Sequence, residues 1–258
     1  MTKLSNLYKK VEAYNNSATI LFRSIELRLV KNKLDKLRWK TCLDLGCGDG
    51  IAAKVVFDKQ VDYGLDNDKV YLEKGRKSGM YKKLLLAEAE KIPLKSGKCD
   101  LVFSNCVVEH IQDLDKVFEE VNRVLVKDGY FVFTSLTENF KNYSVLSFLG
   151  LKRLGAKYGW FREKRLQHYH GYNFEGWQKR LNKQGFKIVD RFYYLDKKTI
   201  EWWDFLSLWS YFFIHVNKKL DWWLYKKIWK SKIYKRFQQI EAVDFRAAAI
   251  GIVAKKIH

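Results

Sequence analysis

A glycine-rich loop with acidic residues close to it is the first feature of this sequence that could do chemistry. Residues 43–50 read LDLGCGDG, with Gly46, Cys47 and Gly48 at the centre. Glycines let the backbone turn sharply and let a ligand approach main-chain N–H groups where a helix begins. The next apolar run ends at Asp66, whose carboxylate can accept hydrogen bonds from both hydroxyls of a ribose. Together these residues predict a site for an adenosine-bearing ligand.

The spacing within the loop discriminates between two such ligands. Dinucleotide sites typically read G-x-G-x-x-G and cradle a pyrophosphate, whereas this loop reads G-x-G-x-G and is preceded by Asp44. A sulfonium ligand has no pyrophosphate but carries a cationic amino-acid tail, which a nearby carboxylate complements. The loop therefore favours S-adenosylmethionine. A nicotinamide-dependent enzyme is the alternative, because Tyr194 and Lys198 form a Tyr-x-x-x-Lys pair, although on a late strand far from the loop.

The elements that must position these residues alternate along the chain. Short apolar runs and segments with helical spacing follow one another after residue 40, which is typical of a parallel sheet with helices on both faces. The expected strands are residues 41–45, 61–65, 83–87, 100–104, 129–135, 186–194 and 245–254. The expected helices are two within residues 4–37, then 49–57, 70–76, 113–126, 142–154 and 175–184, whereas 158–172 is expected to be a loop.

The domain organisation predicted for the 258 residues is a single domain, since the chain has one proline and no linker-like stretch. Within residues 1–258 we expect N-terminal helices over 1–38, a cofactor-binding core over 40–136 and a substrate-side and C-terminal part over 137–258. The last two strands are separated by far more chain than a hairpin needs. We expect a helical, aromatic-rich insertion there, over residues 197–242.

Several segments of the chain, taken together, resemble those of a known family. LDLGCGDG, YGLDND, AEAEKIPL, CDLVFSNCVVEHI and VNRVLVKDGYFVFTS are similar to segments of the class I S-adenosylmethionine-dependent methyltransferases, in the group that includes small-molecule and ubiquinone/menaquinone-pathway enzymes. The similarity covers roughly residues 40–136 and returns over 170–190. It implies an α/β, Rossmann-like sheet of seven strands in the order 3-2-1-4-5-7-6, with the seventh antiparallel, and S-adenosylmethionine as the methyl donor.

The resemblance also implies which residues hold the cofactor. Gly46 and Gly48 would face the methionine moiety, Asp66 the ribose and Asn67 the adenine. The full expected set is Asp44, Gly46, Cys47, Gly48, Asp66, Asn67, Glu88, Ala89 and Asn105.

One position departs from the family pattern. Glu88 stands where the group usually has an acid facing the adenine amino group, with the Ala89 amide at the ring edge. However, residues 87–88 read Ala-Glu rather than the commoner Gly-Asp. The longer side chain makes this contact the least secure of the set.

Catalysis requires a nucleophile aligned behind the methyl group, and a hydroxyl nucleophile also needs a base. His110 follows the fourth strand, at the edge where open sheets bind ligands, and is the first candidate. His168 is the second, in a segment with His170 that is able to cover the site. The alternative interpretations are a helix-start residue for His110 and a solvated basic loop for the other two. For Glu109 a helix-capping role is favoured over a catalytic one.

Residues 200–237 form the aromatic part of the insertion, where Trp and Tyr are mixed with lysines. Residues 205–216 are too short an apolar run to cross a bilayer, which needs about 20 residues. The formal net charge of the chain is +20, so we predict peripheral contact with an anionic membrane surface. An interfacial helix is expected to present Leu220, Trp223, Leu224, Ile228 and Trp229 on one face. A lid over an apolar pocket and a dimer interface are the alternatives.

The acceptor class follows from that expectation. We expect a small or amphiphilic acceptor, such as a lipid, a quinone precursor or a lipid-linked glycan, methylated on O, N or C. RNA methylation and a non-catalytic, membrane-associated scaffold are the alternative functions, and nucleic acid is disfavoured because no RNA-binding module is recognisable.

The four cysteines are expected to be free thiols, because they form no C-x-x-C pair and have no histidine at metal-ligand spacing. No metal site is predicted. Free buried thiols suit a reducing compartment. The expected location is therefore the cytoplasm, with peripheral attachment to the inner face of the membrane.

Overall fold

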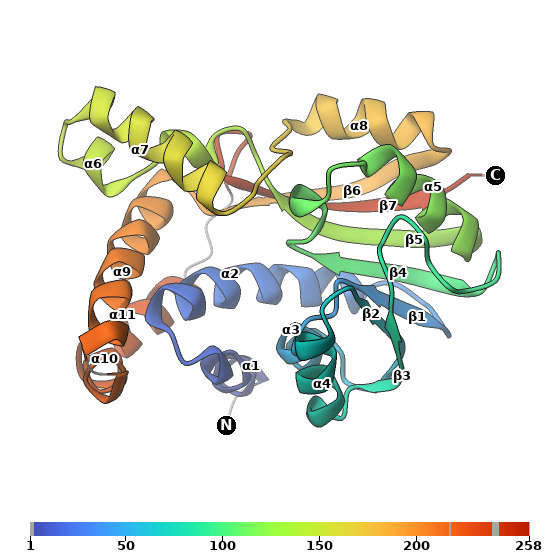
Figure 1. The fold of residues 1–258 in the computed structure, drawn as a ribbon, viewed down its shortest axis with the longest axis horizontal. Helices are drawn as coiled ribbons and strands as arrows, with labels where there is room; N and C mark the ends of the chain where they lie inside the picture. Colours follow the sequence, from blue (N-terminus) through green and yellow to red (C-terminus); the bar gives the residue numbers. More distant parts are fainter. Residues whose placement is uncertain (1–2, 217, 239–242, 258) are drawn as a thin grey trace.

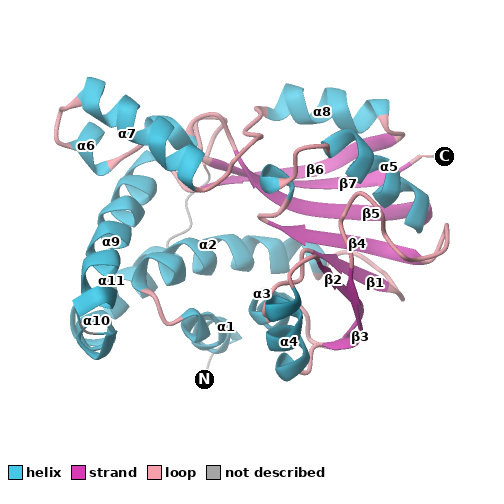
Figure 2. Cartoon of the chain, in the orientation of Figure 1, coloured by secondary structure: helices cyan, strands magenta, loops and turns pink. Residues whose placement is uncertain are grey.

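In the computed structural model of the chain, seven strands form one sheet in the order β3-β2-β1-β4-β5-β7-β6 (Figures 1 and 2). The structure describes residues 3–216, 218–238 and 243–257. The strands are β1 (Cys42–Leu45), β2 (Val61–Asp66), β3 (Tyr81–Leu86), β4 (Cys99–Asn105), β5 (Leu125–Leu136), β6 (Phe186–Tyr194) and β7 (Ala249–Lys256). Neighbours from β3 to β5 are parallel, and β7 is antiparallel to both β5 and β6. The predicted strand order and the antiparallel seventh strand are confirmed.

The central strands are mostly buried and rich in apolar residues because helices cover both faces of the sheet. All four residues of β1 are buried, and β4 is buried at every position except Asp100. Such continuous apolar runs are typical of buried parallel strands. Because Asp44 pairs with Gly64 on one side and Phe103 on the other, the carboxyl ends of β1, β2 and β4 meet at one edge. The loops that follow these strands are therefore brought together.

The helices lie on the two faces and at one end of the sheet. They are α1 (Lys3–Val11), α2 (Ser17–Leu34), α3 (Ile51–Val56), α4 (Lys69–Ser78), α5 (Leu114–Val124), α6 (Val145–Phe148), α7 (Lys152–Arg165), α8 (Phe174–Lys183), α9 (Lys197–Val216), α10 (Lys218–Leu224) and α11 (Lys230–Gln238). Helices α5 and α8 pack on one face, and α2 and α3 pack on the other. Helices α9–α11 extend beyond the end of the sheet (Figure 1), which confirms the predicted helical insertion between the last two strands.

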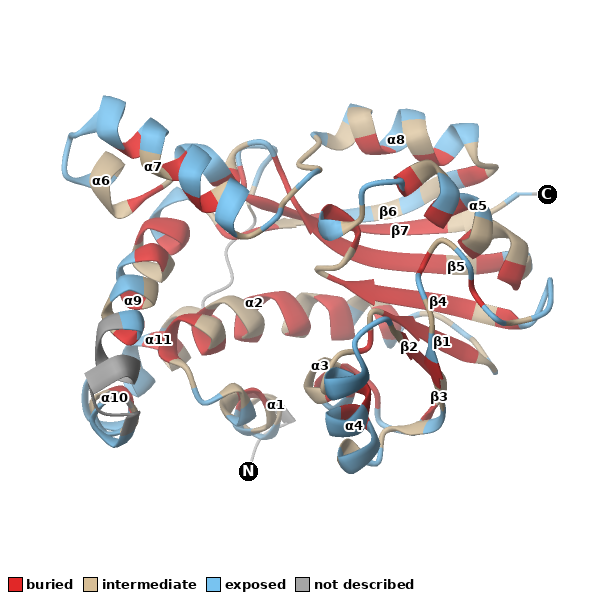
Figure 3. Ribbon diagram, in the orientation of Figure 1, coloured by how far each residue is buried: buried red, intermediate tan, exposed pale blue. Residues whose placement is uncertain are grey.

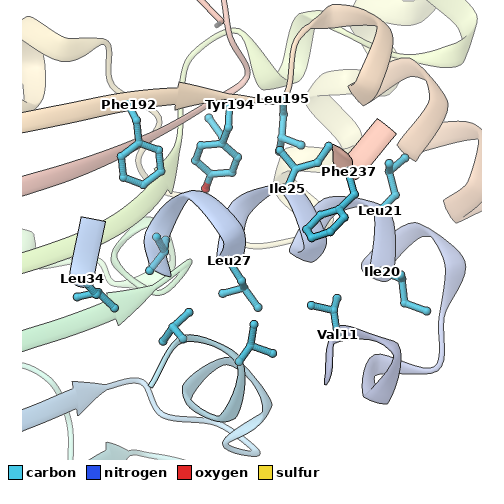
Figure 4. Packing of buried hydrophobic residues seen from close by; sticks show 14 of the residues in the cluster. Val11, Ile20, Leu21, Ile25, Leu27, Leu34, Phe192, Tyr194, Leu195 and Phe237 are labelled. Carbon is cyan, nitrogen blue, oxygen red and sulfur yellow. The ribbon is translucent and has the colours of Figure 1, made fainter. Parts of the chain in front are cut away.

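Helix α2 is the hub of the larger hydrophobic cluster. Figure 4 shows Leu21 and Ile25 of this helix on the side of Leu195, which follows β6, and Phe237 of α11, and Ile20 on the side of Val11 of α1. Contacts on several sides explain why α2 has apolar residues around most of its circumference rather than along one stripe. The N-terminal and C-terminal segments of the chain thus share one core.

The prediction for residues 142–172 was wrong in part. The expected helix over 142–154 is broken into a short 3₁₀ turn (Phe140–Asn142) and α6, and part of the expected loop over 158–172 is helix α7. Two glycines of this segment serve close packing. A Cβ on Gly159 would lie 1.8 Å from the Lys141 carbonyl oxygen, and one on Gly155 would lie 2.3 Å from Ser147 Oγ.

The insertion also differs from the interfacial helix expected over residues 220–229. A π-helical segment (Tyr225–Trp229) shifts the side-chain register there. Leu220, Trp223 and Ile228 are exposed, but Leu224 and Trp229 are partly covered. The buried Tyr225 hydroxyl donates to Glu12 Oε1 at 2.8 Å. The expected apolar face is thus divided between solvent and the protein interior.

The length and apolar character of the helices decide whether one of them could cross a membrane. Among the described residues, no helix combines the length and the apolar character that crossing a bilayer requires.

Candidate active site

The glycine loop after β1 is held against the end of β2. The N–H groups of Gly46 and Cys47 both donate to the Leu65 carbonyl, at 2.8 and 2.9 Å. Asp66 Oδ2 accepts from the Gly48 N–H at 2.8 Å, and its other oxygen accepts from the Asp68 N–H at 2.9 Å. Gly46 has φ +74°, and a Cβ there would lie 2.3 Å from Val107 Cγ2. This position therefore requires glycine for its backbone conformation and for its close approach to the loop after β4.

A first cavity of about 390 Å³ opens between the loops after β1, β2, β3 and β4. Its lining includes Gly46, Asp66, Asn67, Glu88 and Ala89. Asn67 Nδ2 donates to Glu88 Oε2 at 2.9 Å, so the two residues expected beside the adenine lie side by side. The longer Glu88 side chain reaches this partner without difficulty.

Four of the expected cofactor residues do not line the first cavity. Cys47 and Gly48 form the loop backbone behind it, and the Asn105 side chain donates to Thr134 Oγ1 at 2.7 Å. Asp44 is buried and accepts a hydrogen bond from the Tyr81 hydroxyl at 2.7 Å. Burial raises the pKa of Asp44 to about 7, partly offset by that hydrogen bond. Asp44 thus supports the loop from within the sheet, through its hydrogen bond with Tyr81.

A second cavity of about 210 Å³ lies on the other side of the loop after β4. Apolar and aromatic side chains from four parts of the chain make most of its wall, and polar side chains are grouped along the remainder. It is lined by Thr19, Phe22, Arg23, Cys106, Glu109, His110, Leu136, Phe140, Leu166, His168 and Trp203. A cavity of roughly 150 Å³ holds a benzene ring, so this one can take a group about the size of a single ring.

Cys106 and His110 line both cavities and therefore form the partition between them. Cys106 has φ +51°, a left-handed conformation that is uncommon for a residue other than glycine. Its amide donates to Thr134 Oγ1 at 3.0 Å, which helps to hold this bend. Backbone strain of this kind persists where the surroundings over-determine it, and it is common at functional sites.

A buried charged cluster from α2 supports the second cavity. Glu26 is fully buried and accepts from Arg23 Nη1 at 2.6 Å, Tyr194 Oη at 2.7 Å and Cys106 Sγ at 3.0 Å. Burial disfavours the Glu26 carboxylate, but Arg23 and these hydrogen bonds outweigh it and lower the pKa of Glu26 below its usual value. Tyr194 thus has a structural partner, and the Tyr-x-x-x-Lys match with Lys198 has no counterpart in the site.

The three histidines considered as candidates fall into two groups. The rings of His110 and His168 lie with centroids 4.9 Å apart, and both line the second cavity. Burial, with a contribution from His168, lowers the pKa of His110, so its ring is neutral near pH 7. His170 instead joins two loops, with Nδ1 2.9 Å from the Tyr172 hydroxyl and Nε2 3.2 Å from the Gln112 carbonyl oxygen.

Glu109 is the most unusual group in the second cavity. It is 1% exposed, and among the described residues its Oε2 atom has no hydrogen-bond partner. Burial raises the pKa of Glu109 to about 8, so the side chain is mainly a neutral acid at pH 7. The side chain is not engaged in the expected helix cap, since the 3₁₀ turn Val108–His110 has no side-chain cap.

Several residues of the second cavity carried no signal in the sequence. Phe22 and Arg23 come from α2, and Trp203 comes from α9. No local motif links these helices to the loop after β4. The Arg23–Glu26 pair, three residues apart in the mostly apolar first half of α2, was an available hint.

Cysteine pairing and metal binding are the remaining chemical features predicted from the sequence. All four cysteines are free thiols. Within the part of the chain that the structure describes, no group of three or more His, Cys, Asp or Glu side chains is arranged to hold a metal ion.

Comparisons with known proteins agree with this geometry. Residues 43–133 match the family model described as "Methyltransferase domain". A malonyl-[acyl-carrier protein] O-methyltransferase from Legionella pneumophila is 36% identical over 107 residues, which are 39% of this chain and 38% of that protein. A ubiquinone biosynthesis O-methyltransferase from Vibrio atlanticus is 29% identical over 139 residues, which are 50% of this chain and 57% of that protein. The matches thus span less than two thirds of each relative.

A solved structure extends the likeness to the whole fold. An S-adenosylmethionine-dependent methyltransferase from Thermotoga maritima, described as a possible histamine N-methyltransferase, superposes with a TM-score of 0.56. The superposition covers 91% of this chain and 89% of that one at 17% identity. Residues 43–133 thus match a methyltransferase domain, the chain shares the fold of a solved S-adenosylmethionine-dependent methyltransferase, and the sequence resemblance to that class is confirmed.

Proposed function

We propose that this chain transfers a methyl group from S-adenosylmethionine, held in the first cavity, to a nucleophilic O, N or C atom of a small or amphiphilic acceptor in the second cavity. The observation that carries the proposal is that Cys106 and His110 line both cavities. A donor and an acceptor on the two sides of this partition would meet there, with little room for water between them.

The lining of the first cavity fits the donor. The Asp66 carboxylate is positioned to accept the ribose hydroxyls, and the Asn67–Glu88 pair to face the adenine. Gly46 leaves its backbone open to the amino-acid end of the ligand. When bound, S-adenosylmethionine supplies an electrophilic methyl group on a sulfonium leaving group.

The proton of the acceptor can be taken by groups of the chain itself. His110 is neutral near pH 7 and lies in the partition, and His168 stands beside it. We add Glu109 to these two candidates, because it lines the same cavity as both histidines and because its buried Oε2 has no hydrogen-bond partner among the described residues. An acceptor hydroxyl or amine that donates to Oε2 would satisfy a buried polar atom that otherwise lacks a partner.

The second cavity suits part of an amphiphile better than a whole large molecule. Its volume of about 210 Å³ is ring-sized, and Phe22, Phe140 and Trp203 contribute aromatic walls. Because α2 and α9 both contribute to it, the N-terminal helices, the core and the insertion act as one domain in this proposal. RNA methylation and a non-catalytic scaffold gain no specific support from these walls.

Peripheral membrane contact through residues 200–237 stays part of the proposal in a reduced form. Trp202, Trp203 and Trp229 pack against the hydrophobic core, so they are not available to a bilayer. Exposed Trp223 and Ile228 remain, with Lys226 and Lys227 beside them. These side chains support a contact at the end of the molecule that α10 and α11 form.

Incubation with methyl-labelled S-adenosylmethionine tests the proposed activity. Lipid, protein, RNA and small-metabolite extracts would be offered separately, each with the wild-type chain and with an Asp66→Ala control. Label that enters the lipid or small-metabolite fraction with the wild-type chain alone supports the proposal. Label confined to RNA, or equal label with both chains, contradicts it.

A further inference from the structure

The segment where α6 meets α7 projects from the body of the molecule and exposes apolar side chains. We call residues 148–151 the hairpin tip; its side chains are those of Phe148, Leu149 and Leu151. Phe148 is 69% exposed and Leu149 is 63% exposed. Figure 1 shows α6 and α7 at the upper left, away from the sheet, and Figure 3 shows the tip as exposed. Consecutive exposed residues of this size are unusual for a surface that meets only water.

The outer face of α7 continues this surface and is basic. Arg153, Lys157 and Lys164 are exposed and lie at helical spacing on one side of the helix. Leu154 and Phe161 are exposed beside them. Residues 140–162 contain no aspartate or glutamate. The hairpin tip and this face of α7 together form a basic surface with an apolar edge.

The opposite face of α7 is firmly anchored. Arg162 and Asp204 of α9 form a buried ion pair at 2.8 Å, with each side chain 1% exposed. Arg162 Nη2 also donates to the carbonyl oxygens of Phe140 and Tyr143, at 2.6 and 2.9 Å. Because α7 is fixed by its inner face, the exposure of its outer face reflects a defined orientation rather than loose packing.

We infer that the hairpin tip and the outer face of α7 dock on an anionic phospholipid bilayer. Leu and Phe side chains would enter the boundary between headgroups and acyl chains, and the basic side chains would lie against anionic headgroups. A protein partner is a poorer match because lysine is depleted from protein interfaces. RNA is also a poorer match, because two of the three tip side chains, Leu149 and Leu151, are aliphatic and offer no face for base stacking.

This surface adjoins an entry to the proposed acceptor site. A groove of about 680 Å³ is lined by Trp160 and Lys164 of α7 and, further along, by His168 and Tyr169. His168 also lines the second cavity, and Tyr169 the first. An amphiphile anchored in the bilayer could extend its polar end along this groove. The lipid-docking inference thus deepens the proposed function, on which its choice of acceptor rests, but the docking itself does not require turnover.

Vesicle co-sedimentation of the full chain without cofactor tests the inference. Vesicles of phosphatidylcholine alone would be compared with vesicles of equal parts phosphatidylcholine and phosphatidylglycerol. We expect Phe148→Asp/Leu149→Asp to weaken binding to the anionic vesicles at least about tenfold, because two apolar side chains no longer leave water. Arg153→Gln/Lys157→Gln/Lys164→Gln is expected to weaken it about a hundredfold, at about fivefold for each charge, and to leave binding to neutral vesicles unchanged.

A control variant locates the effect. Val70→Asp changes a similarly exposed apolar residue on α4, on another edge of the molecule. This variant is expected to bind anionic vesicles within about threefold of the wild-type chain, and circular dichroism would establish that all variants are folded. The inference is wrong if the wild-type chain does not sediment with anionic vesicles, or if the tip variant binds as the wild type does. It is also wrong if the tip variant changes only the oligomeric state.

Failure here is distinguishable from failure of the proposed function. Absence of vesicle binding with normal methyl transfer would remove the docking surface alone. Vesicle binding without methyl transfer to any extract would leave the docking surface in place and remove the proposed activity.

Discussion

The first and second cavities are built from the sequence in opposite ways. The first cavity is assembled mainly from loops that directly follow β1, β2, β3 and β4, so every wall residue except Tyr169 lies at a strand end or in the loop that follows it. The second cavity draws on α2, the loop after β4, the segment after β5, the loop after α7, and α9. The first is a property of the sheet edge, whereas the second depends on how distant helices pack. The family match over residues 43–133 covers the loops of the first cavity and little of the second.

This difference implies that the two cavities should respond differently to mutation. Changes in the first cavity should affect binding of the donor while the remaining fold stays intact. Changes around the second should combine losses of activity and of stability, because the side chains that we propose to bind the acceptor also hold α2 in place.

The largest expected effect is that of Glu109→Gln in the second cavity. With Glu109 as the base, the rate of methyl transfer should fall about 10²–10⁴-fold, since the amide cannot accept the proton. The wild-type rate should rise with pH through about 8, where Glu109 ionises, and the variant should lack this rise. The measurement is the pH profile of S-adenosylhomocysteine formation with the acceptor fraction that takes up label.

The same profile discriminates between Glu109 and His110. Because burial lowers the pKa of His110, a His110 base would give a rise below about pH 6.5 instead. Stability provides a second readout. The raised pKa of Glu109 means that folding becomes less favourable as pH rises from the usual carboxyl range through about 8. Glu109→Gln should remove this fall in stability at high pH. If the variant keeps both the pH profile of the rate and the pH dependence of stability of the wild type, Glu109 is neither the base nor the group that titrates on unfolding.

The second prediction concerns Asp66 in the first cavity and its contribution to ligand affinity. Asp66→Ala should weaken S-adenosylhomocysteine binding at least about a hundredfold, because hydrogen bonds to a charged group contribute about 1.5–3 kcal/mol each. Isothermal titration calorimetry measures this directly. Asp68→Ala is the matched control: Asp68 caps α4 through the Val70 and Tyr71 amides, so its loss should reduce stability by about 1 kcal/mol with little change in affinity. Equal affinities for wild type and Asp66→Ala would contradict the assignment.

The third prediction concerns the charged cluster of α2. Glu26→Gln leaves the Arg23 guanidinium without its ionic partner, and urea unfolding at pH 7 should show a loss of about 3 kcal/mol. The lowered pKa of Glu26 means that its contribution is present above the usual carboxyl range and is lost as pH falls. The difference from wild type should therefore narrow in acid. Glu119→Gln, which breaks an exposed pair with Lys116, should cost less than about 1 kcal/mol, and an equal cost for the two variants would refute the role of the cluster.

The smallest effect compares two glycines with similar backbones. Gly150→Ala at the hairpin tip has φ +80° and open space around the new Cβ, so it should cost about 1 kcal/mol. Gly46→Ala has φ +74° and meets Val107 at 2.3 Å, which should add about 1–3 kcal/mol of overpacking. Thermal unfolding of the two variants gives the comparison. Equal destabilisation would mean that the loops after β1 and β4 do not hold each other.

Local signals made the sheet and the first cavity predictable. The glycine loop, Asp66 and the Asn67–Glu88 pair lie at strand ends, where spacing along the chain fixes position in space. Asp44 was expected to face the ligand but is buried against Tyr81, because alternation along β1 cannot reveal which strand residue has a covering partner. Residues 158–172 were expected to be a loop because they are rich in Tyr, His and Arg, yet residues up to 165 belong to α7, where Gly155 and Gly159 serve close helix packing.

The second cavity was beyond prediction for a different reason. Arg23 and Trp203 reach it only through the packing of α2 and α9, which no local pattern encodes. Glu109 was given a capping role because its position suits one; only the three-dimensional structure reveals that its Oε2 atom is buried without a partner. His110 and His168 were candidates from the sequence, and the structure places their rings side by side, but their chemical role stays a prediction.

The central claim is that donor and acceptor meet at the partition formed by Cys106 and His110. A crystal structure of the chain with S-adenosylhomocysteine tests it most directly. The account predicts the ribose on Asp66 and the sulfur atom beside Cys106, facing the second cavity. A ligand bound elsewhere, or one in the first cavity whose sulfur faces away from this partition, would contradict it.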